Sequence, residues 1–266
     1  MYEKHWKLKE KPFENTPDTH FLYNSAQHEE GLNRMLYVVR ESKGAGLLTG
    51  VYGCGKTLLA RALTKELENS IYKVAMVTNP RLNDIEMLRM IAYHLGASEP
   101  PTHKADILIS LERILQNNMS DGKKTVVVID EAHAIEDRSI FEEIRLLLNF
   151  QYEDRFLLTL LLLGQPELKE KVEANKQLNQ RIAMRFFLEP LKQDETANYI
   201  IHRITTAGGS KDIFTPEALA AIYERSGGIP RRINQICDLS LLTGFGKEAV
   251  SVTDDIVQET IRSLSL

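Results

Sequence analysis

The sequence has 266 residues, 43% of them hydrophobic and 26% charged, proportions that are ordinary for a globular protein with a buried core. Its formal net charge of -4 at pH 7 gives no general attraction to nucleic acid or to anionic membranes, although a local basic patch is compatible with it. Cys54 and Cys237 have no metal or disulfide spacing, and the longest apolar run, residues 156–163, is too short to span a bilayer. Because the charged N-terminus is no secretory signal, we expect a cytoplasmic protein without direct membrane insertion.

Strands and helices alternate over the first two thirds of the chain. Residues 1–43 are expected to form an N-terminal segment with a turn-rich part and then a helix over about 25–41. Apolar strands are predicted at 45–49, 73–78, 125–130, 156–163 and 185–188, and helices at 56–68, 83–95, 104–118 and 138–149. This alternation predicts an α/β fold with a parallel sheet covered by helices on both faces.

After Pro190 the pattern becomes purely helical. Four helices are expected near residues 194–206, 216–226, 230–243 and 254–264. We therefore predict an N-terminal segment over 1–43, an α/β core over 44–190 and a helical domain over 191–266.

Residues 50–57 have the sequence GVYGCGKT, which matches the phosphate-binding pattern G-x-x-x-x-G-K-[ST] between a predicted strand and a predicted helix. Glycine lets backbone N–H groups turn inward around phosphates at the positive end of the following helix. Lys56 would neutralise β- and γ-phosphate oxygens, and the Thr57 hydroxyl would bind Mg²⁺. The expected contacts to the nucleotide come from Gly50, Gly53, Cys54, Gly55, Lys56, Thr57 and Leu58.

Two carboxylates follow the β-branched run over residues 126–129. Asp130 would hold Mg²⁺, usually through water, and Glu131 would orient or deprotonate the attacking water. With Ala132 and His133 they complete the letters D-E-A-H, but the chain has no room for the second RecA-like domain of a helicase. His133 is therefore expected to be a helix-start or interface residue.

Gln165 follows the predicted strand over 156–163 and has two open interpretations. If this strand lies beside the strand that precedes the phosphate-binding loop, Gln165 would contact the γ-phosphate or the lytic water. Otherwise it is a turn residue before Pro166.

Three arginines also have two interpretations each. Arg181 and Arg185 would reach the nucleotide of a neighbouring subunit and stabilise transition-state charge, or they are ordinary surface arginines. Arg231 lies in the first turn of a predicted helix, where positive charge is unfavourable unless an anion is near. A bound phosphate would supply that anion.

Taken together, these motifs resemble those of AAA+ ATPases. More narrowly, they resemble the branch that contains the general secretion pathway protein A ATPases and their short relatives in pilus and exopolysaccharide systems. The resemblance also covers the N-terminal pattern Pro12-Phe13, Thr16-Pro17-Asp18, Phe21-Leu22-Tyr23, His28-Glu29-Glu30 and Leu32, as well as Gly164-Gln165-Pro166, Gln180-Arg181-Ile182 and Gly228-Ile229-Pro230-Arg231. The long members of this branch continue into membrane and peptidoglycan-binding regions, which the given sequence does not contain, so we expect either a short form without these regions or a piece of a longer chain.

The resemblance implies a P-loop core with a five-stranded sheet in the order 5-1-4-3-2 and a helical lid. It implies that Gln165 is the sensor-1 residue, that Arg231 is the sensor-2 arginine and that Arg181 or Arg185 is an arginine finger. The N-terminal segment is expected to pack near the adenine. Val51, Tyr52 and Cys54 depart from the smaller, more polar loop that the resemblance leads us to expect.

These expectations describe an enzyme that hydrolyses ATP with Mg²⁺, assembled as a homo-oligomeric ring or arc. Its work would be to drive an envelope system for secretion, pilus assembly or polysaccharide export, with recruitment to the inner membrane by a partner protein. Two alternatives remain open. One is an ATP-dependent DNA-binding adaptor of the transposition or replication-initiation type, and the other is a nucleotide-gated scaffold with low turnover.

Overall fold

The computed structural model describes residues 1–68 and 71–264, which form two compact units. The sheet unit consists of residues 29–50 and 59–188, and the helical unit consists of residues 1–28, 51–58 and 189–266. Each unit has its own hydrophobic core, so each is described by itself.

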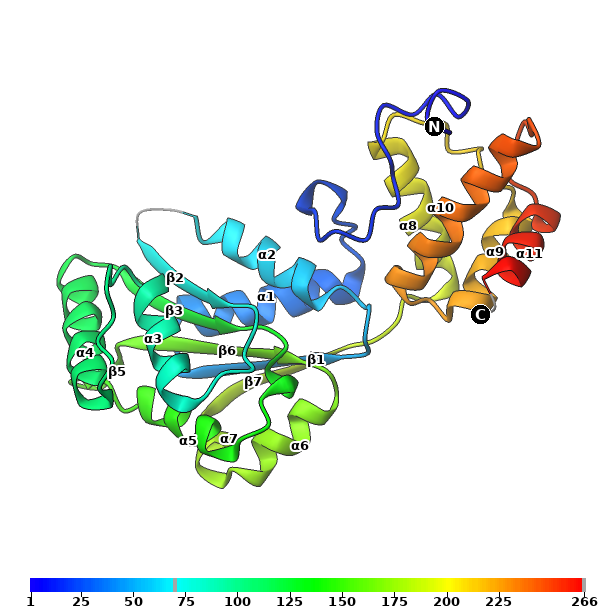
Figure 1. Cartoon of the computed structure of the whole chain (residues 1–266). Helices are drawn as coiled ribbons and strands as arrows, with labels where there is room; N and C mark the ends of the chain where they lie inside the picture. Colours follow the sequence, from blue (N-terminus) through cyan, green and yellow to red (C-terminus); the bar gives the residue numbers. More distant parts are fainter. Residues whose placement is uncertain (69–70, 265–266) are drawn as a thin grey trace. The chain divides into compact units, whose positions relative to one another are not determined.

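The sheet unit is built on five parallel strands in the order β2-β3-β6-β1-β7 (Figure 1). These strands are β1 (Ala45–Gly50), β2 (Tyr72–Val77), β3 (Lys124–Ile129), β6 (Leu158–Gly164) and β7 (Ile182–Leu188). The three inner strands are apolar and almost wholly buried, as expected where helices cover both faces, whereas the edge strands β2 and β7 alternate between buried and more exposed positions. Numbered along the chain, the order is the predicted 5-1-4-3-2.

Helices cover both faces of this sheet (Figure 1). On one face, Leu48, Val126 and Leu161 pack with α1 (Ala26–Arg40) and with the part of α2 (Lys56–Glu66) that belongs to the sheet unit. On the other face, Leu47, Val127 and Leu160 pack with the remaining helices, which are α3 (Asp84–His94), α4 (Lys104–Ser120), α5 (Arg138–Leu147), α6 (Glu167–Ala174) and α7 (Lys176–Arg181). Neighbouring residues of a strand point to opposite faces, so one apolar run serves both layers.

Two features of the sheet unit differ from the prediction. The strand predicted at 156–163 begins at Leu158, because Arg155–Phe156 (β5) pairs antiparallel with Gln151–Tyr152 (β4) in a separate hairpin. The helices α6 and α7 were not predicted. They have 8 and 6 residues, which is too short for a helical repeat of apolar residues to stand out.

The helical unit contains the four helices expected after Pro190. These are α8 (Gln193–Thr206), α9 (Pro216–Ser226), α10 (Pro230–Gly246) and α11 (Asp254–Ser263). Thr215 caps α9 through its side chain, and proline occupies the first turn of α9 and of α10, where its missing N–H costs no hydrogen bond.

The first 28 residues belong to this helical unit and not to the sheet unit. Trp6 donates its indole N–H to the carbonyl of Leu241 at 2.9 Å, and the buried Arg203 donates to the carbonyl of Glu14 at 3.2 Å. The Arg203 guanidinium also lies 4.9 Å from the ring centre of Phe21. The predicted segment over 1–43 is thus divided, because the aromatic residues of its first part pack on α8 and α10 while most of α1 packs on the sheet.

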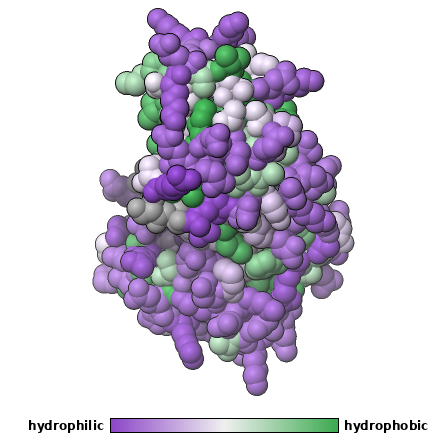
Figure 2. Space-filling model, turned by 90° about the vertical axis from the view of Figure 1, so that its right-hand side faces the viewer, coloured by the Kyte–Doolittle hydropathy of each residue, from purple (hydrophilic) through white to green (hydrophobic). Residues whose placement is uncertain are grey.

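The face drawn in Figure 2 is dominated by hydrophilic side chains. The large apolar side chains that are most exposed lie on separate elements, which is usual for a protein surface. They include Tyr93, Ile109, Tyr52 and Val250. None of the helices within residues 1–68 and 71–264 has the combined length and apolarity that crossing a bilayer requires.

Candidate functional site

Three of the predicted site positions follow strands that end at the same edge of the sheet. β1 ends at Gly50, β3 leads into Asp130 and β6 leads into Gln165. Thr49 lies beside Gly164 and Ile129 lies beside Leu162, so β6 runs directly between β1 and β3. Two strand spacings separate β1 from β3, which is about 10 Å. The strand that precedes Gln165 thus lies beside the strand that precedes the loop. This is the arrangement in which we expected Gln165 to contact the γ-phosphate or the lytic water.

Gly50 is required by the packing of two strands as well as by the loop that it begins. A Cβ atom at this position would lie 2.5 Å from the carbonyl oxygen of Leu188 on β7. No larger residue fits there unless the two strands separate.

The loop itself, residues 51–58, belongs to the helical unit. Gly53 and Gly55 have φ angles of +86° and +99°, a backbone region that favours glycine. Lys56 begins α2, is 5% exposed and donates from Nζ to the carbonyl of Val51 at 3.0 Å. Thr57 and Leu58 follow in the first turn, so the loop ends at a helix N-terminus, where backbone N–H groups attract anions.

Cys54 is fully buried in this loop. Burial raises the pKa of its thiol to about 11, with Lys56 acting weakly in the opposite direction. The thiol therefore stays protonated at neutral pH, and Cys54 contributes backbone groups and volume to the loop.

Arg231 contacts the loop from the first turn of α10. Its backbone N–H donates to the carbonyl of Gly53 at 3.2 Å, and its guanidinium donates to the hydroxyl of Tyr52 and lies 4.6 Å from the centre of that ring. The oxygen and the π face of Tyr52 offset the unfavourable position of a cation at a helix N-terminus. Tyr52, which departs from the expected loop pattern, is thus the partner of Arg231.

Each unit supplies residues of a type that fits a nucleotide with a divalent cation. A Cβ atom on Gly53 would lie 3.0 Å from Arg231, and one on Gly55 would lie 3.0 Å from His28, so this turn can be built only with bare backbone at both positions. The carboxylate of Asp130, 2% exposed, and the hydroxyl of Thr57 are the oxygen ligands that Mg²⁺ prefers.

Glu131 has an unusual backbone conformation, with φ 52° and ψ 29°. A non-glycine residue there carries strain of about 1–3 kcal/mol, and such strain clusters at functional sites. The turn is held by two hydrogen bonds, from the Glu131 N–H to Asp130 Oδ1 at 2.9 Å and from the Ala134 N–H to the Glu131 carbonyl at 2.8 Å. The carboxylate of Glu131 is 39% exposed and therefore accessible to water.

His133 connects Glu131 with Gln165. Its Nδ1 lies 3.4 Å from the Glu131 carboxylate and 3.3 Å from the backbone nitrogen of Gln165, and its Nε2 lies 2.9 Å from the side-chain amide of Gln165. A neutral imidazole carries one hydrogen on its two nitrogens. If the hydrogen is on Nδ1, this atom donates to Glu131, and if it is on Nε2, Nδ1 accepts from Gln165. The prediction that His133 is a helix-start residue agrees with its place in the 3-10 helix Ala132–Ala134, but it did not foresee this link.

The two arginines proposed as fingers differ in their surroundings. Arg181 donates to the carbonyl of Leu148 at 3.0 Å and to Asn149 Oδ1 at 2.9 Å, and it lies 5.7 Å from the ring centre of Phe156. Arg185 lies on the edge strand β7 and is exposed, and its guanidinium donates to the carbonyl of Asn179 at 3.1 Å and to Asn179 Oδ1 at 2.6 Å. Arg181 thus braces its own unit, whereas Arg185 extends from an exposed strand.

A family model described as "AAA domain" matches residues 39–172, half of the chain. The chain belongs to the AAA domain family. General secretion pathway protein A of Aeromonas hydrophila is 36% identical over 250 residues, which cover 93% of this chain and 45% of that protein. The chain thus spans less than half the length of the curated relatives it matches.

Solved structures show the same fold at low sequence identity. The Aeropyrum pernix ORC2 protein in ADPNP–ADP complexes matches with a TM-score of 0.67 and 19% identity, over 91% of this chain and 71% of that one. The Aeropyrum pernix ORC1 protein in complex with DNA matches with a TM-score of 0.72 and 16% identity, over 97% and 70%. This AAA domain therefore has the P-loop AAA+ fold predicted from the sequence.

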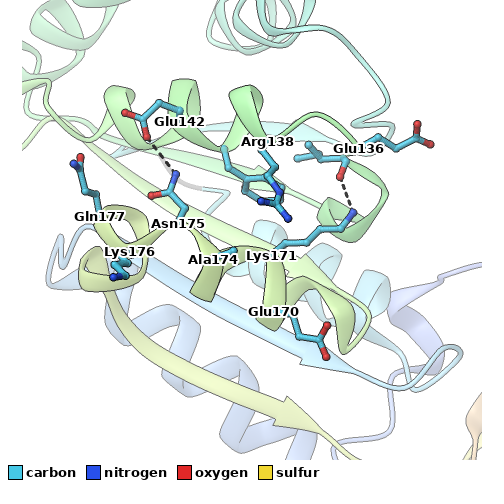
Figure 3. A pocket seen from close by; sticks show the side chains of 11 residues that line it. Glu136, Arg138, Glu142, Glu170, Lys171, Ala174, Asn175, Lys176 and Gln177 are labelled. Atoms are coloured by element: carbon cyan, nitrogen blue, oxygen red, sulfur yellow. Dashed lines mark hydrogen bonds between the residues drawn. The ribbon is translucent and has the colours of Figure 1, made fainter.

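The AAA domain also has a hollow of about 690 Å³ between α5, α6 and α7 (Figure 3). Its lining is both polar and apolar, and the side chains of Lys171 and Glu142 are held by neighbours. Lys171 Nζ donates to the carbonyls of His133 at 2.5 Å and Ile135 at 2.7 Å, and Asn175 donates to Glu142 at 3.2 Å. Lys171 thus fixes the segment that carries His133.

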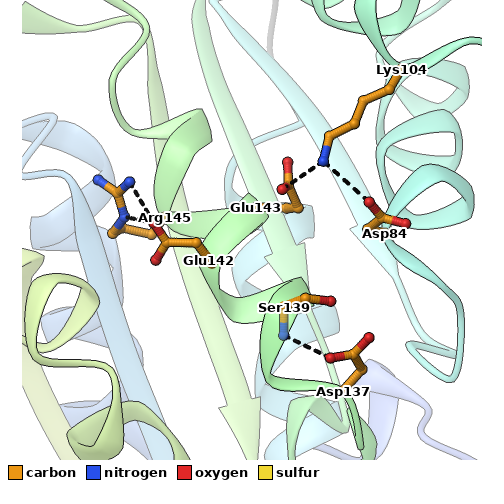
Figure 4. Close-up of polar contacts among 7 residues, drawn as sticks. All are labelled: Asp84, Lys104, Asp137, Ser139, Glu142, Glu143 and Arg145. Atoms are coloured by element: carbon orange, nitrogen blue, oxygen red, sulfur yellow. Dashed lines mark hydrogen bonds and ion pairs between the residues drawn. The ribbon is translucent and has the colours of Figure 1, made fainter.

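On the other side of α5, an ion-pair group holds this helix against α3 and α4 (Figure 4). Lys104 lies 3.1 Å from the carboxylate of Asp84 and 2.6 Å from that of Glu143. The hydrogen bond to Glu143 is the main reason that the pKa of Lys104 is raised, and Lys104 in turn lowers the pKa of Asp84. The helix that follows the Glu131 turn is therefore fixed from both sides.

Proposed function

We propose that this chain is an ATPase that binds ATP with Mg²⁺ through residues 50–58 and hydrolyses it at the Glu131 turn. The observation that carries the proposal is the shared sheet edge, where β1 leads into the loop, β3 leads into Asp130 and Glu131, and β6 leads into Gln165. The AAA domain family supports nucleotide as the ligand.

Each residue has a distinct role in the proposal. Lys56 and the N–H groups of the loop bind the phosphates, and Thr57 and Asp130 hold the metal. When bound, Mg²⁺ neutralises charge on the phosphate oxygens.

Three further residues act on the reaction itself. Glu131 orients the attacking water and accepts its proton. Gln165 hydrogen-bonds the γ-phosphate or the water, and Arg231 donates to the γ-phosphate as charge develops there.

Two substitutions test this proposal. Glu131→Gln keeps the size of the side chain but removes the base, so MgATP binding should remain and phosphate release should stop. Lys56→Ala should weaken nucleotide binding itself. Both are measured by calorimetric titration and by steady-state phosphate release. Hydrolysis by Glu131→Gln at the wild-type rate would refute the role of Glu131.

The proposal extends to a homo-oligomer, a ring or an arc, in which Arg185 reaches the nucleotide of the next subunit. The exposure of Arg185 on an edge strand supports it. The hydrolysis rate per subunit should rise with protein concentration, and sizing with MgATP should show larger particles than sizing without nucleotide. A rate per subunit that stays low and constant would instead favour the nucleotide-gated scaffold.

The biological setting that we propose is an envelope system for secretion, pilus assembly or polysaccharide export, with a partner that recruits the protein to the inner membrane. Its support is the 36% identity to general secretion pathway protein A over 93% of this chain. Crosslinking in cells followed by membrane fractionation tests it. Recovery of the protein with nucleoid DNA and without any envelope protein would reject this setting.

The alternative is a DNA-binding adaptor, favoured by the fold shared with the ORC1 protein solved in complex with DNA. The basic residues available for it are partly engaged, since Lys123 pairs with Asp121 at 2.7 Å and Lys124 donates to the carbonyl of Arg40. Titration with duplex DNA over a salt series decides between the two, because phosphate contacts produce a steep loss of affinity with salt.

A further inference from the structure

A buried histidine lies directly behind the loop of residues 51–58. His28, in the first turn of α1, is 7% exposed, and its Nε2 lies 3.0 Å from the carbonyl oxygen of Cys54. Its Nδ1 lies 2.8 Å from the hydroxyl oxygen of Ser25. All three residues belong to the helical unit, together with the loop.

These two contacts determine which nitrogen of His28 carries the hydrogen. A carbonyl oxygen can only accept, so Nε2 must donate to Cys54. The Ser25 hydroxyl then donates to Nδ1 while it accepts the backbone N–H of His28 at 3.3 Å. Burial, the largest cause, lowers the pKa of His28, which keeps the ring neutral in this arrangement.

The hydrogen bond from His28 sets the orientation of one peptide group. In a planar trans peptide the C=O and the N–H point in opposite directions, so holding the Cys54 carbonyl toward His28 turns the Gly55 N–H away from it. A peptide beside glycine can otherwise rotate as a unit, because glycine accepts both signs of φ. The rotated form would present a carbonyl oxygen where the unrotated form presents a donor.

We infer that His28 is a positioning residue of the phosphate site, which holds the Cys54–Gly55 peptide so that the Gly55 N–H faces the phosphates of the nucleotide. The inference rests on the proposed function, because it assigns a residue to the same site. Both ring nitrogens of His28 are engaged by Cys54 and Ser25, so its proposed effect on the phosphates is indirect. Its contact is with the back of the loop, where a Cβ atom on Gly55 would lie 3.0 Å from its Nε2.

The test compares His28→Leu, which fills the space without a donor, with His28→Gln, whose amide N–H₂ restores one. MgADP binding to the full chain is measured by calorimetry, with the Gly55 amide signal followed by NMR and thermal unfolding recorded without nucleotide. Loss of one oriented donor should weaken binding about tenfold in His28→Leu, with most of the affinity recovered in His28→Gln. The shift of the Gly55 signal on adding MgADP should shrink in His28→Leu and return in His28→Gln.

The matched control is His20→Leu, because the His20 side chain belongs to the same unit and is 58% exposed. It should bind MgADP like the wild type. The inference is overturned if His28→Leu binds as tightly as the wild type, or if His28→Gln loses as much affinity and as much thermal stability as His28→Leu. Wild-type protein that binds no MgADP would overturn the proposed function itself, and the inference with it.

Discussion

The side-chain amide of Gln165 lies 2.9 Å from Nε2 of His133. The same ring reaches the Glu131 carboxylate through Nδ1, so the two residues proposed to act on the attacking water share one neighbour. The imidazole of His133 thus lies between Glu131, which follows β3, and Gln165, which follows β6. Removing this ring should therefore affect both residues.

The first prediction follows from this contact. His133→Ala should lower kcat about tenfold, because the side-chain amide of Gln165 loses its hydrogen bond to the ring and the Glu131 carboxylate loses a neighbour at 3.4 Å, while MgADP binding stays unchanged. Steady-state phosphate release and calorimetry measure the two quantities. His94→Ala, on the exposed side of α3, is the control and should leave both as they are. An unchanged kcat in His133→Ala would contradict the coupling.

Arg231 and Arg232 allow a second, matched comparison, since both are exposed and adjacent in the first turn of α10. Only Arg231 contacts Tyr52 among the interactions described. Arg231→Ala should reduce hydrolysis about tenfold to a hundredfold, as expected when a donor to transition-state charge is lost. Arg232→Ala should hydrolyse ATP at the wild-type rate, and equal losses in the two variants would remove the special role of Arg231.

The third prediction separates Arg181 from Arg185. Arg181→Ala breaks hydrogen bonds to Leu148 and Asn149 and should lower the free energy of unfolding by about 1–2 kcal/mol. Arg185→Ala loses only exposed hydrogen bonds to Asn179, so it should cost less than about 1 kcal/mol while hydrolysis falls about a thousandfold. Mixing Arg185→Ala with Glu131→Gln should restore activity in part, since one intact site forms at a mixed boundary. Full activity of Arg185→Ala alone, or an inactive Arg185→Ala that regains nothing on mixing, would exclude Arg185 as a finger.

Two neighbouring glycines give a test of stability. Gly228 has a φ of +72°, and a Cβ atom there would lie 1.9 Å from the carbonyl oxygen of Leu191. Gly227 has a φ of +61° and no atom within 4 Å of the same position. Gly227→Ala should cost about 1 kcal/mol of backbone strain, whereas Gly228→Ala should cost more than about 3 kcal/mol. Chemical denaturation measures both, and equal effects would show that the backbone yields at Gly228.

The pKa of Cys54 predicts a pH effect. Because this pKa is raised from 9.0 to about 11, folding favours the protonated thiol; its contribution is complete below pH 9 and is lost as the pH rises to 11. Between these values the wild type should lose up to about 2 kcal/mol more stability than Cys54→Ala. The measurement is the slope of the unfolding free energy against pH in the two proteins. Cys54→Ala also changes stability by an amount that does not depend on pH, and this amount leaves the slope unchanged. Parallel slopes would show that the thiol is not desolvated.

Much of the fold could be predicted because its signals are local. The β-branched residues ending at Ile129 predict a central strand, and the change to purely helical spacing after Pro190 predicts a separate group of helices. The hairpin at Gln151–Tyr152 and Arg155–Phe156 was missed, since two-residue strands have no period to detect. Phe156 was assigned to β6 because it is as apolar as the residues that follow it.

The site was less predictable, since its motifs are local and its contacts are not. Lys56, Asp130 and Glu131 stand out through spacing and strand context. Nothing local marks His28 as a neighbour of the loop, because its acceptor at Cys54 is 26 residues away. Tyr52 and Arg231 are 179 residues apart, and no periodicity relates such positions. A tyrosine where a small residue is expected was the one available signal.

The chain passes from one compact unit to the other at four points, after residues 28, 50, 58 and 188. Neither unit is therefore a continuous stretch of polypeptide, and no single cleavage can release one of them whole. A fragment ending near residue 190 would keep Tyr2, Trp6 and Phe13 but lose the helices that bury them, and those rings would promote aggregation. Dissection of this protein is therefore better done by point substitution than by deletion, because each unit needs segments from both halves of the chain.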